Sequence, residues 1–92
     1  MAEIFKIILA KNDGATLCFN YDGTALPGGS SASALTVRDG SGGEWEFKCK
    51  SEGGNSFSIS GPGWWSFAGT RIDRRVTLSK KKGENFYRIT VI

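Results

Sequence analysis

The fold class is decided by one stretch, Glu44-Trp45-Glu46-Phe47-Lys48-Cys49-Lys50, in which polar and apolar residues alternate without a break. Such alternation is typical of a β-strand that turns one face to a core and the other to solvent. We expect Trp45, Phe47 and Cys49 to face the core and the charged residues to face outward. A β-rich protein is therefore predicted.

Short apolar stretches on both sides of this strand predict more strands. Glycine, 13 of the 92 residues, punctuates the chain between them. Seven strands at this close spacing are typical of a barrel or a sandwich. The other six predicted strands are residues 4–9, 16–21, 35–38, 57–60, 71–79 and 86–92.

The remaining segments predict one short helix and several turns. Trp64-Trp65-Ser66-Phe67-Ala68 has apolar residues at the spacing of one or two helical turns. Residues 25–34 are rich in Pro, Gly, Ser and Ala and are expected to form a loop. Asn12-Asp13-Gly14 turns the chain after its first strand, which fits a hairpin of the first two strands.

Length and composition indicate a single domain over residues 1–92. With 39% hydrophobic and 12% aromatic residues, the chain can build one core but not two. No apolar run approaches the roughly 18 residues of a membrane span, and the first ten residues contain Glu3 and Lys6. We therefore expect a soluble, non-secreted chain with no membrane partner.

The residue types present argue against catalysis. Histidine is absent, which removes His-based acid/base chemistry, His-containing triads and the usual zinc ligand sets. The glycine-rich stretches lack a phosphate-binding Gly-x-x-x-x-Gly-Lys pattern. No enzyme activity, metal or cofactor is expected. Cys18 and Cys49 are interpreted as small buried hydrophobes, with a disulfide as the alternative.

Charge is distributed unevenly along the chain. The net charge is +3, but residues 1–47 carry three basic against six acidic residues, and residues 48–92 carry nine against three. The halves are thus at −3 and +6, so the second half is the candidate anion-binding half.

Several motifs follow one another in a fixed order over nearly the whole chain. They are residues 5–9, Leu35-Thr36-Val37-Arg38-Asp39-Gly40, Trp45-Glu46-Phe47-Lys48, Phe57-Ser58-Ile59, Gly63-Trp64-x-x-Phe67 and residues 86–92. In this order they resemble the plant B3 DNA-binding domain family, and Gly63-Trp64-x-x-Phe67 after an alternating hairpin is the most specific of them. Where the family usually carries Leu-x-x-Gly-Asp after its helix, residues 72–76 read Ile-Asp-Arg-Arg-Val, so a diverged, reproductive-meristem-like member fits best.

The resemblance implies an all-β fold with one or two short helices, the seven-stranded open β-barrel called the DNA-binding pseudobarrel. It also implies a plant transcription regulator in the nucleus that binds double-stranded DNA sequence-specifically. Two loop arms would grip the major groove. Other transcription factors or a second copy of the chain are further expected partners.

Transferred by position, the resemblance places the first arm at residues 10–16 and the second arm at residues 48–56. Lysine can pair with phosphates, whereas asparagine can read adenine through two hydrogen bonds. The alternative for the lysines is that they merely solvate a strand beside Glu44 and Glu46. The expected DNA-binding residues are Lys11 and Asn12 in the first arm and Lys48, Lys50, Ser51, Asn55 and Ser56 in the second.

Other conspicuous residues have more than one interpretation. Trp45, Trp64 and Phe67 are expected in the core. Trp65 is expected to be partly buried, and the alternative is an exposed ring that stacks on a base or a partner. Two basic clusters, Arg71 with Arg74 and Arg75, and residues 80–82, either solvate the surface or bind nucleic acid at a second surface. Residues 80–82 can also form part of an import signal. The alternative function is a non-enzymatic barrel module that binds a protein or a carbohydrate through its glycine-rich loops and Trp65.

Overall fold

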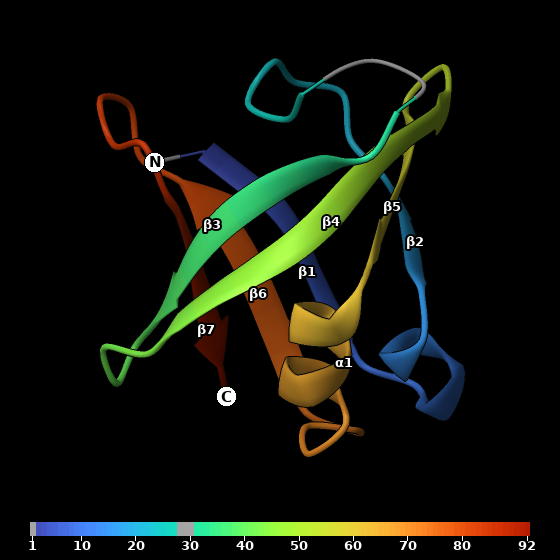
Figure 1. Cartoon of the computed structure of the whole chain (residues 1–92), viewed down its shortest axis with the longest axis vertical. Coiled ribbons are helices and arrows are strands. Elements are labelled where there is room, and N and C mark those ends of the chain that lie inside the picture. The colour runs from blue at the N-terminus through green and yellow to red at the C-terminus, as the bar shows by residue number, and fades with distance from the viewer. Residues whose placement is uncertain (1, 28–30) are drawn as a thin grey trace.

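The computed structural model describes residues 2–27 and 31–92. Residue 1 and residues 28–30 of the predicted loop lie outside the described residues. Within them the chain forms seven strands, one α-helix and one short 3-10 helix (Figure 1). The elements in chain order are β1 (Ala2–Ile8), η1 (Lys11–Gly14), β2 (Leu17–Asn20), β3 (Ser33–Asp39), β4 (Glu44–Gly53), β5 (Ser56–Ser60), α1 (Pro62–Ala68), β6 (Arg75–Lys80) and β7 (Tyr87–Val91).

The strands form one sheet that curls into an open barrel. Their order is β1-β6-β7-β3-β4-β5-β2, with β3 and β7 parallel and the other neighbouring pairs antiparallel. The end strands β1 and β2 approach each other, since the rings of Phe5 and Phe19 lie 4.9 Å apart. The predicted β-rich, seven-stranded open barrel is confirmed.

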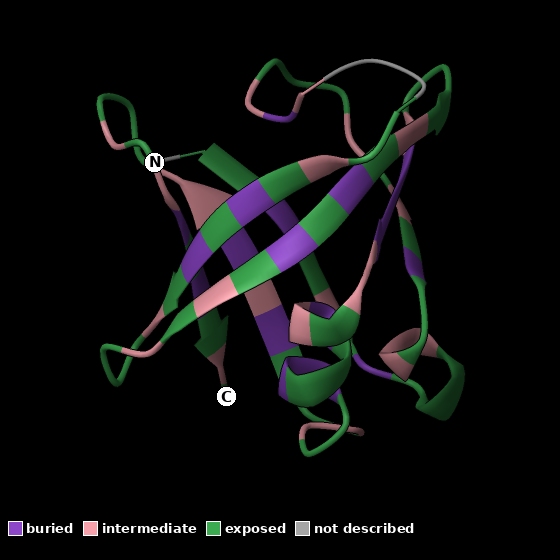
Figure 2. Ribbon diagram, viewed as in Figure 1, coloured by how far each residue is buried: buried purple, intermediate pink, exposed green. Residues whose placement is uncertain are grey.

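Alternation along β4 builds the centre of the core, as predicted (Figure 2). Phe47 and Cys49 are buried, and Phe47 packs edge-on against Trp64, with ring centroids 5.1 Å apart. Phe67 is also fully buried. Trp45 packs on this cluster and is half-buried, and its indole N–H donates to Asp39 Oδ2 at 2.9 Å. The predicted core aromatics therefore lie inside or against the core.

The helix α1 packs against β4 at very short range. Pro62 opens it, which suits the first helical turn, where the missing N–H has no partner in any case. A Cβ at Gly63 would lie 1.9 Å from the carbonyl oxygen of Glu46. Only glycine permits this approach, which brings Trp64 and Phe67 into the barrel.

Three sequence-based boundaries or pairings were wrong. β1 does not form a hairpin with β2: it pairs with β6, whereas β2 pairs with β5. The strand predicted at residues 71–79 begins at Arg75, because residues 71–74 turn, with Asp73 at φ 67°. β4 continues to Gly53, three residues beyond the end of the strand predicted at residues 44–50, so only a tight turn separates it from β5. Partner choice and strand ends depend on distant residues, which local periodicity does not encode.

Candidate nucleic-acid interface

The first arm, residues 10–16, is a compact turn fastened to the core. The Asp13 carboxylate accepts a hydrogen bond from Ala10 N at 2.8 Å, and Asp13 N donates back to Ala10 O at 2.9 Å. The Trp64 indole N–H donates to the Asp13 carbonyl at 2.7 Å. Lys11 and Asn12 are exposed on this turn. The helix α1 therefore holds the backbone that presents both side chains.

The second arm, residues 48–56, is the β4–β5 hairpin. Its turn relies on glycine, since Gly53 and Gly54 have φ of 104° and 58°. The carbonyl of Asn55 accepts a hydrogen bond from Tyr21 N at 2.8 Å, which ties the tip to the end of β2. The Asn55 side chain lies exposed at this tip.

Between the arms lies one surface of the barrel, here called the outer face. It consists of the side chains of β4, β5 and β2 that alternate with the core residues. Lys50 pairs with Ser58, which pairs in turn with Cys18, so these three form a row across the strands. The outer face is made of Lys48, Lys50, Ser56, Ser58, Ser60, Cys18 and Asn20.

The arms lie at opposite ends of this face. β2 begins beyond η1 and ends beside the β4–β5 turn, so both arms border the β2–β5 pair (Figure 1). Cys18 and Asn20 are exposed there, and sequence reasoning did not select them. The alternation of β2, whose Leu17 is buried, indicates that both residues face outward, but their place between the arms follows from the pairing of β2 with β5.

The structure places the seven sequence-predicted residues in different settings. Lys48 and Lys50 are exposed on the outer face, with the half-buried Ser56 nearby on β5. Ser51 differs from the others, because it alternates toward the side of Cys49 and its hydroxyl accepts a hydrogen bond from Gly53 N at 3.5 Å. Lys11, Asn12 and Asn55 are exposed at the two borders.

The strand β4 carries three acidic residues besides its lysines. Glu44 forms an ion pair with Arg38 at 3.4 Å, at the far end of β4. Glu52 accepts a hydrogen bond from the Ser58 hydroxyl of the outer face at 2.9 Å. Glu46 is exposed on the same side of β4 as Lys48, two residues before it, so Lys48 has an acidic neighbour on its own strand.

The other basic clusters lie away from the outer face. Arg71 donates to the Phe67 carbonyl at 2.8 Å and stacks over the Phe67 ring at 4.2 Å. Arg74 Nε donates to the Ile92 carbonyl at 3.0 Å. The turn that carries residues 80–82 lies on the side of the barrel opposite the β4–β5 hairpin (Figure 1).

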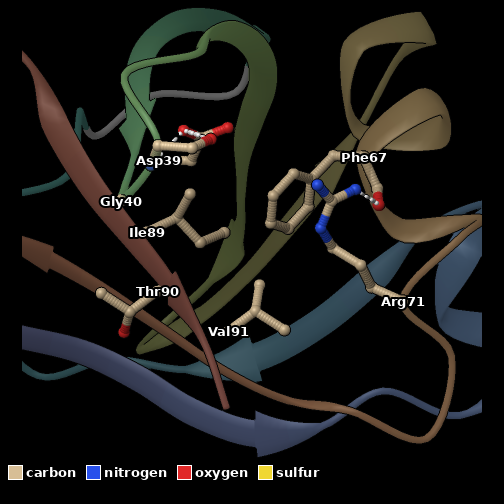
Figure 3. A pocket seen from close by; sticks show the side chains of 8 residues that line it. Asp39, Gly40, Phe67, Arg71, Ile89, Thr90 and Val91 are labelled. Atoms are coloured by element: carbon tan, nitrogen blue, oxygen red, sulfur yellow. Dashed lines mark hydrogen bonds between the residues drawn. The ribbon is translucent and has the colours of Figure 1, made fainter.

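A hollow of about 300 Å³ opens at the ends of β3 and β7, between Asp39 and Arg71 (Figure 3). The Asp39 carboxylate accepts hydrogen bonds from the Trp45 indole, the Ser41 hydroxyl and backbone, and Gly43 N, which lower its pKa to about 2. These contacts fasten the β3–β4 turn. The carboxylate is thus a structural acceptor.

Three further findings concern metal ions, membranes and the cysteines. Within residues 2–27 and 31–92, no cluster of three or more His, Cys, Asp or Glu is arranged to hold a metal ion. No helix in that part of the chain is long and apolar enough to cross a membrane. Both cysteines are free: Cys49 is buried, as predicted, but Cys18 is exposed, because its side of β2 faces outward.

Comparison with known proteins supports the architecture. No family model and no curated protein matches the chain. Among solved structures, the chain is similar to the protein of an Arabidopsis FUS3-DNA complex. The match has a TM-score of 0.68 at 12% sequence identity and covers 97% of this chain and 95% of that one. The fold is the B3-type pseudobarrel.

Proposed function

We propose that the chain is a single, non-enzymatic domain that binds double-stranded DNA, as part of a plant transcription regulator in the nucleus. The duplex would lie across the outer face with the two arms in its major groove. The observation that carries the proposal is the position of both arms at the borders of one exposed, lysine-bearing face. The likeness in fold to the protein of a DNA complex supports it.

The dimensions of the outer face suit a duplex. A strand rises about 3.3 Å per residue, so four-residue β2 holds the arms roughly 13 Å apart. The major groove of B-DNA is ~12 Å wide. A separation of this size is comparable to the width of the groove, which supports the proposal that both arms reach one groove.

Each predicted residue has a proposed role that follows from its chemistry. Lys11, Lys48 and Lys50 would contact phosphates and supply affinity that falls with salt. Asn12 and Asn55 present amides that can pair with adenine edges. Ser51 and Ser56 would make shorter polar contacts, Ser51 after releasing its bond to Gly53.

The sequence-specific grip is tested by titrating a selected and a random duplex at two salt concentrations. Lys50→Ala should weaken binding to both duplexes alike and flatten the slope of log K against log salt by about 0.9. Asn55→Ala should cost roughly 1 to 3 kcal/mol on the selected duplex and almost nothing on random DNA. Lys82→Ala, in the turn on the opposite side of the barrel, is the matched control.

Two results would count against the proposal. Absence of retardation by any duplex, even at low salt, would reject DNA binding. Unchanged binding by both Lys50→Ala and Asn55→Ala, with the fold intact, would reject the second arm. The stoichiometry of the retarded complex also distinguishes one bound copy of the chain from two. Repeating the titration in the presence of another transcription factor tests whether that factor is a partner.

A second candidate function is supported by one observation. Trp65 is 65% exposed and lines, with Gly61 and Pro62, an apolar hollow on α1. An exposed aromatic is suited to stack on a sugar or a partner protein. If Trp65→Ala abolishes capture of a glycan or protein while DNA binding is absent in the parent chain, the interaction module is the correct function.

A further inference from the structure

We infer that Glu52 is a base-reading residue, whose carboxylate accepts a hydrogen bond from the exocyclic amine of a cytosine in the major groove. The inference rests on the proposed function, because it requires a duplex across the outer face. A carboxylate at such a place is unexpected, since it repels phosphates. Three features of Glu52 favour a contact with a base edge.

The first feature is a β-bulge that aims the side chain. Ser51 pairs with Phe57 and Gly53 pairs with Ser56, so Glu52 is an extra residue on β4 with no partner of its own on β5. Bulges bend a strand and redirect the side chain at the irregular position. Glu52 is exposed, at the point where the outer face meets the tip of the second arm.

The second feature is an anchor that fixes the carboxylate over β5. Ser58 is only 7% exposed, and its hydroxyl donates to Glu52 Oε1 at 2.9 Å. Ser58 belongs to the row that runs from Lys50 to Cys18. The Glu52 side chain therefore reaches back onto the centre of the outer face, and part of its rotamer freedom is lost before any ligand binds.

The third feature is the hydrogen-bonding capacity that remains. An ionised carboxylate only accepts hydrogen bonds, and Ser58 uses Oε1. Within residues 2–27 and 31–92, Glu52 Oε2 accepts no hydrogen bond, so this oxygen is available for a donor. In the major groove the matching donor for Glu is the N4 amine of cytosine, whereas adenine places its N7 acceptor beside its amine.

The competing explanation is general repulsion. A carboxylate near phosphates weakens binding to every duplex equally, whatever its sequence. Base reading instead changes the preference at one position of the site. Measurements of affinity across the four bases at each position separate the two effects.

The test is selection from randomised duplexes with the whole chain, followed by titration of the selected site with each base at each position. The parent chain should require cytosine at one position. Glu52→Gln keeps the shape and an acceptor for Ser58 but adds amide donors, which favour adenine. We expect its preference for cytosine there to fall about fivefold and to move toward adenine, with other positions unchanged.

Ser58 provides an independent check, as a positioning residue. Ser58→Ala removes the anchor and should reduce the same cytosine preference about threefold. The reason is that binding must then fix the Glu52 side chain, which costs conformational entropy. Ser58→Thr retains the hydroxyl and should show the same cytosine preference as the parent chain. The salt slope should not change in either variant, because no phosphate contact is lost.

The outcomes are distinguishable. If Glu52→Gln strengthens binding to all duplexes by the same factor and leaves every base preference intact, Glu52 only repels and the inference is overturned, while the proposed function stands. If the parent chain retards no duplex at low salt, the proposed function fails and Glu52 has no base to read.

Discussion

The two arms reach the outer face in different ways. The first arm is placed by a contact across the molecule, from the Trp64 indole to the Asp13 carbonyl, 51 positions apart in the chain. The second arm is placed by its own strands and by glycines at positive φ in its turn. Damage to the core should therefore release the first arm, whereas the second arm should respond mainly to changes in its own turn.

Removing Trp64 gives the largest expected effect. Trp64→Ala deletes a fully buried side chain, and we expect a loss of roughly 3 to 5 kcal/mol in the free energy of unfolding. Urea denaturation measures this loss. The next residue along the chain gives a matched control. Trp65 is 65% exposed, and Trp65→Ala should change the free energy of unfolding by less than about 0.5 kcal/mol.

Trp64→Phe sharpens the same comparison, because it keeps a ring in the core but removes the N–H donor to Asp13. Amide hydrogen exchange should accelerate at residues 10–16 and stay slow at residues 48–56. Equal acceleration in both arms would show that the arms are not held independently.

Gly63→Ala should come next. Its new Cβ would lie 1.9 Å from the Glu46 carbonyl oxygen, so α1 must move away from β4. Overpacking of this kind costs typically about 1 to 3 kcal/mol. Thermal unfolding checks the prediction, with Gly40→Ala as the control, because a Cβ at Gly40 meets nothing within 4 Å. A stable Gly63→Ala chain with slow exchange in the first arm would contradict the role of α1.

Gly53→Ala tests the second arm on its own. An alanine at φ 104° is strained, and we expect a cost of roughly 1 to 2 kcal/mol, with faster exchange at the hairpin tip alone. Gly14→Ala in the first arm is the counterpart, because its φ is not positive and its Cβ would meet nothing within 4 Å. That variant should be neutral or slightly stabilising. Equal losses of stability in Gly53→Ala and Gly14→Ala would contradict the idea that only the second arm depends on glycine in its turn.

Protonation of Asp39, which lies outside both arms, should lower the stability by a smaller amount. The Asp39 carboxylate has its pKa lowered from 3.8 to about 2, first by the Trp45 hydrogen bond and then by Ser41 and Gly43. Its contribution to stability is present above pH 3.8 and is lost as the pH falls toward 2. Urea midpoints at pH 5, 4, 3 and 2 should therefore drop more steeply for the parent chain than for Asp39→Asn. Parallel pH profiles would contradict this.

Chemical modification of Cys18 should change the stability less than any of the substitutions above. Cys18 is exposed between the arms, whereas burial raises the pKa of the Cys49 thiol to about 11. A maleimide at neutral pH should modify Cys18 and leave Cys49 unmodified, as peptide mass mapping will show. Under the proposed function the adduct also blocks the duplex. Cys18→Ser should bind DNA like the parent chain and resist the reagent, and inhibition of that variant would indicate damage elsewhere.

Local sequence patterns predicted those parts of the fold in which the environment of a residue depends on its neighbours in the sequence. The alternation around Phe47 predicted β4 and its buried face because a strand repeats every two residues. The spacing of Trp64 and Phe67 predicted α1. Motif resemblance supplied the barrel, which single elements do not specify.

What could not be predicted depends on residues far apart in the chain. The pairing of β2 with β5 creates the outer face, so Cys18 and Asn20 became candidate contacts only in three dimensions. The same holds for Glu52, because the bulge after Ser51 follows from the register of two strands. The roles of the seven predicted site residues stay predictions until DNA is titrated.

The pairing of β1 with β6 also affects how the barrel assembles. Ala2 lies opposite Lys80, so the first strand finds its partner only after the residues up to Lys80 have been synthesised. Closing so long a loop costs entropy before any contact repays it, and sheets of this kind fold in milliseconds to seconds. Until then β1 is an unpaired apolar strand, and such strands are prone to aggregate.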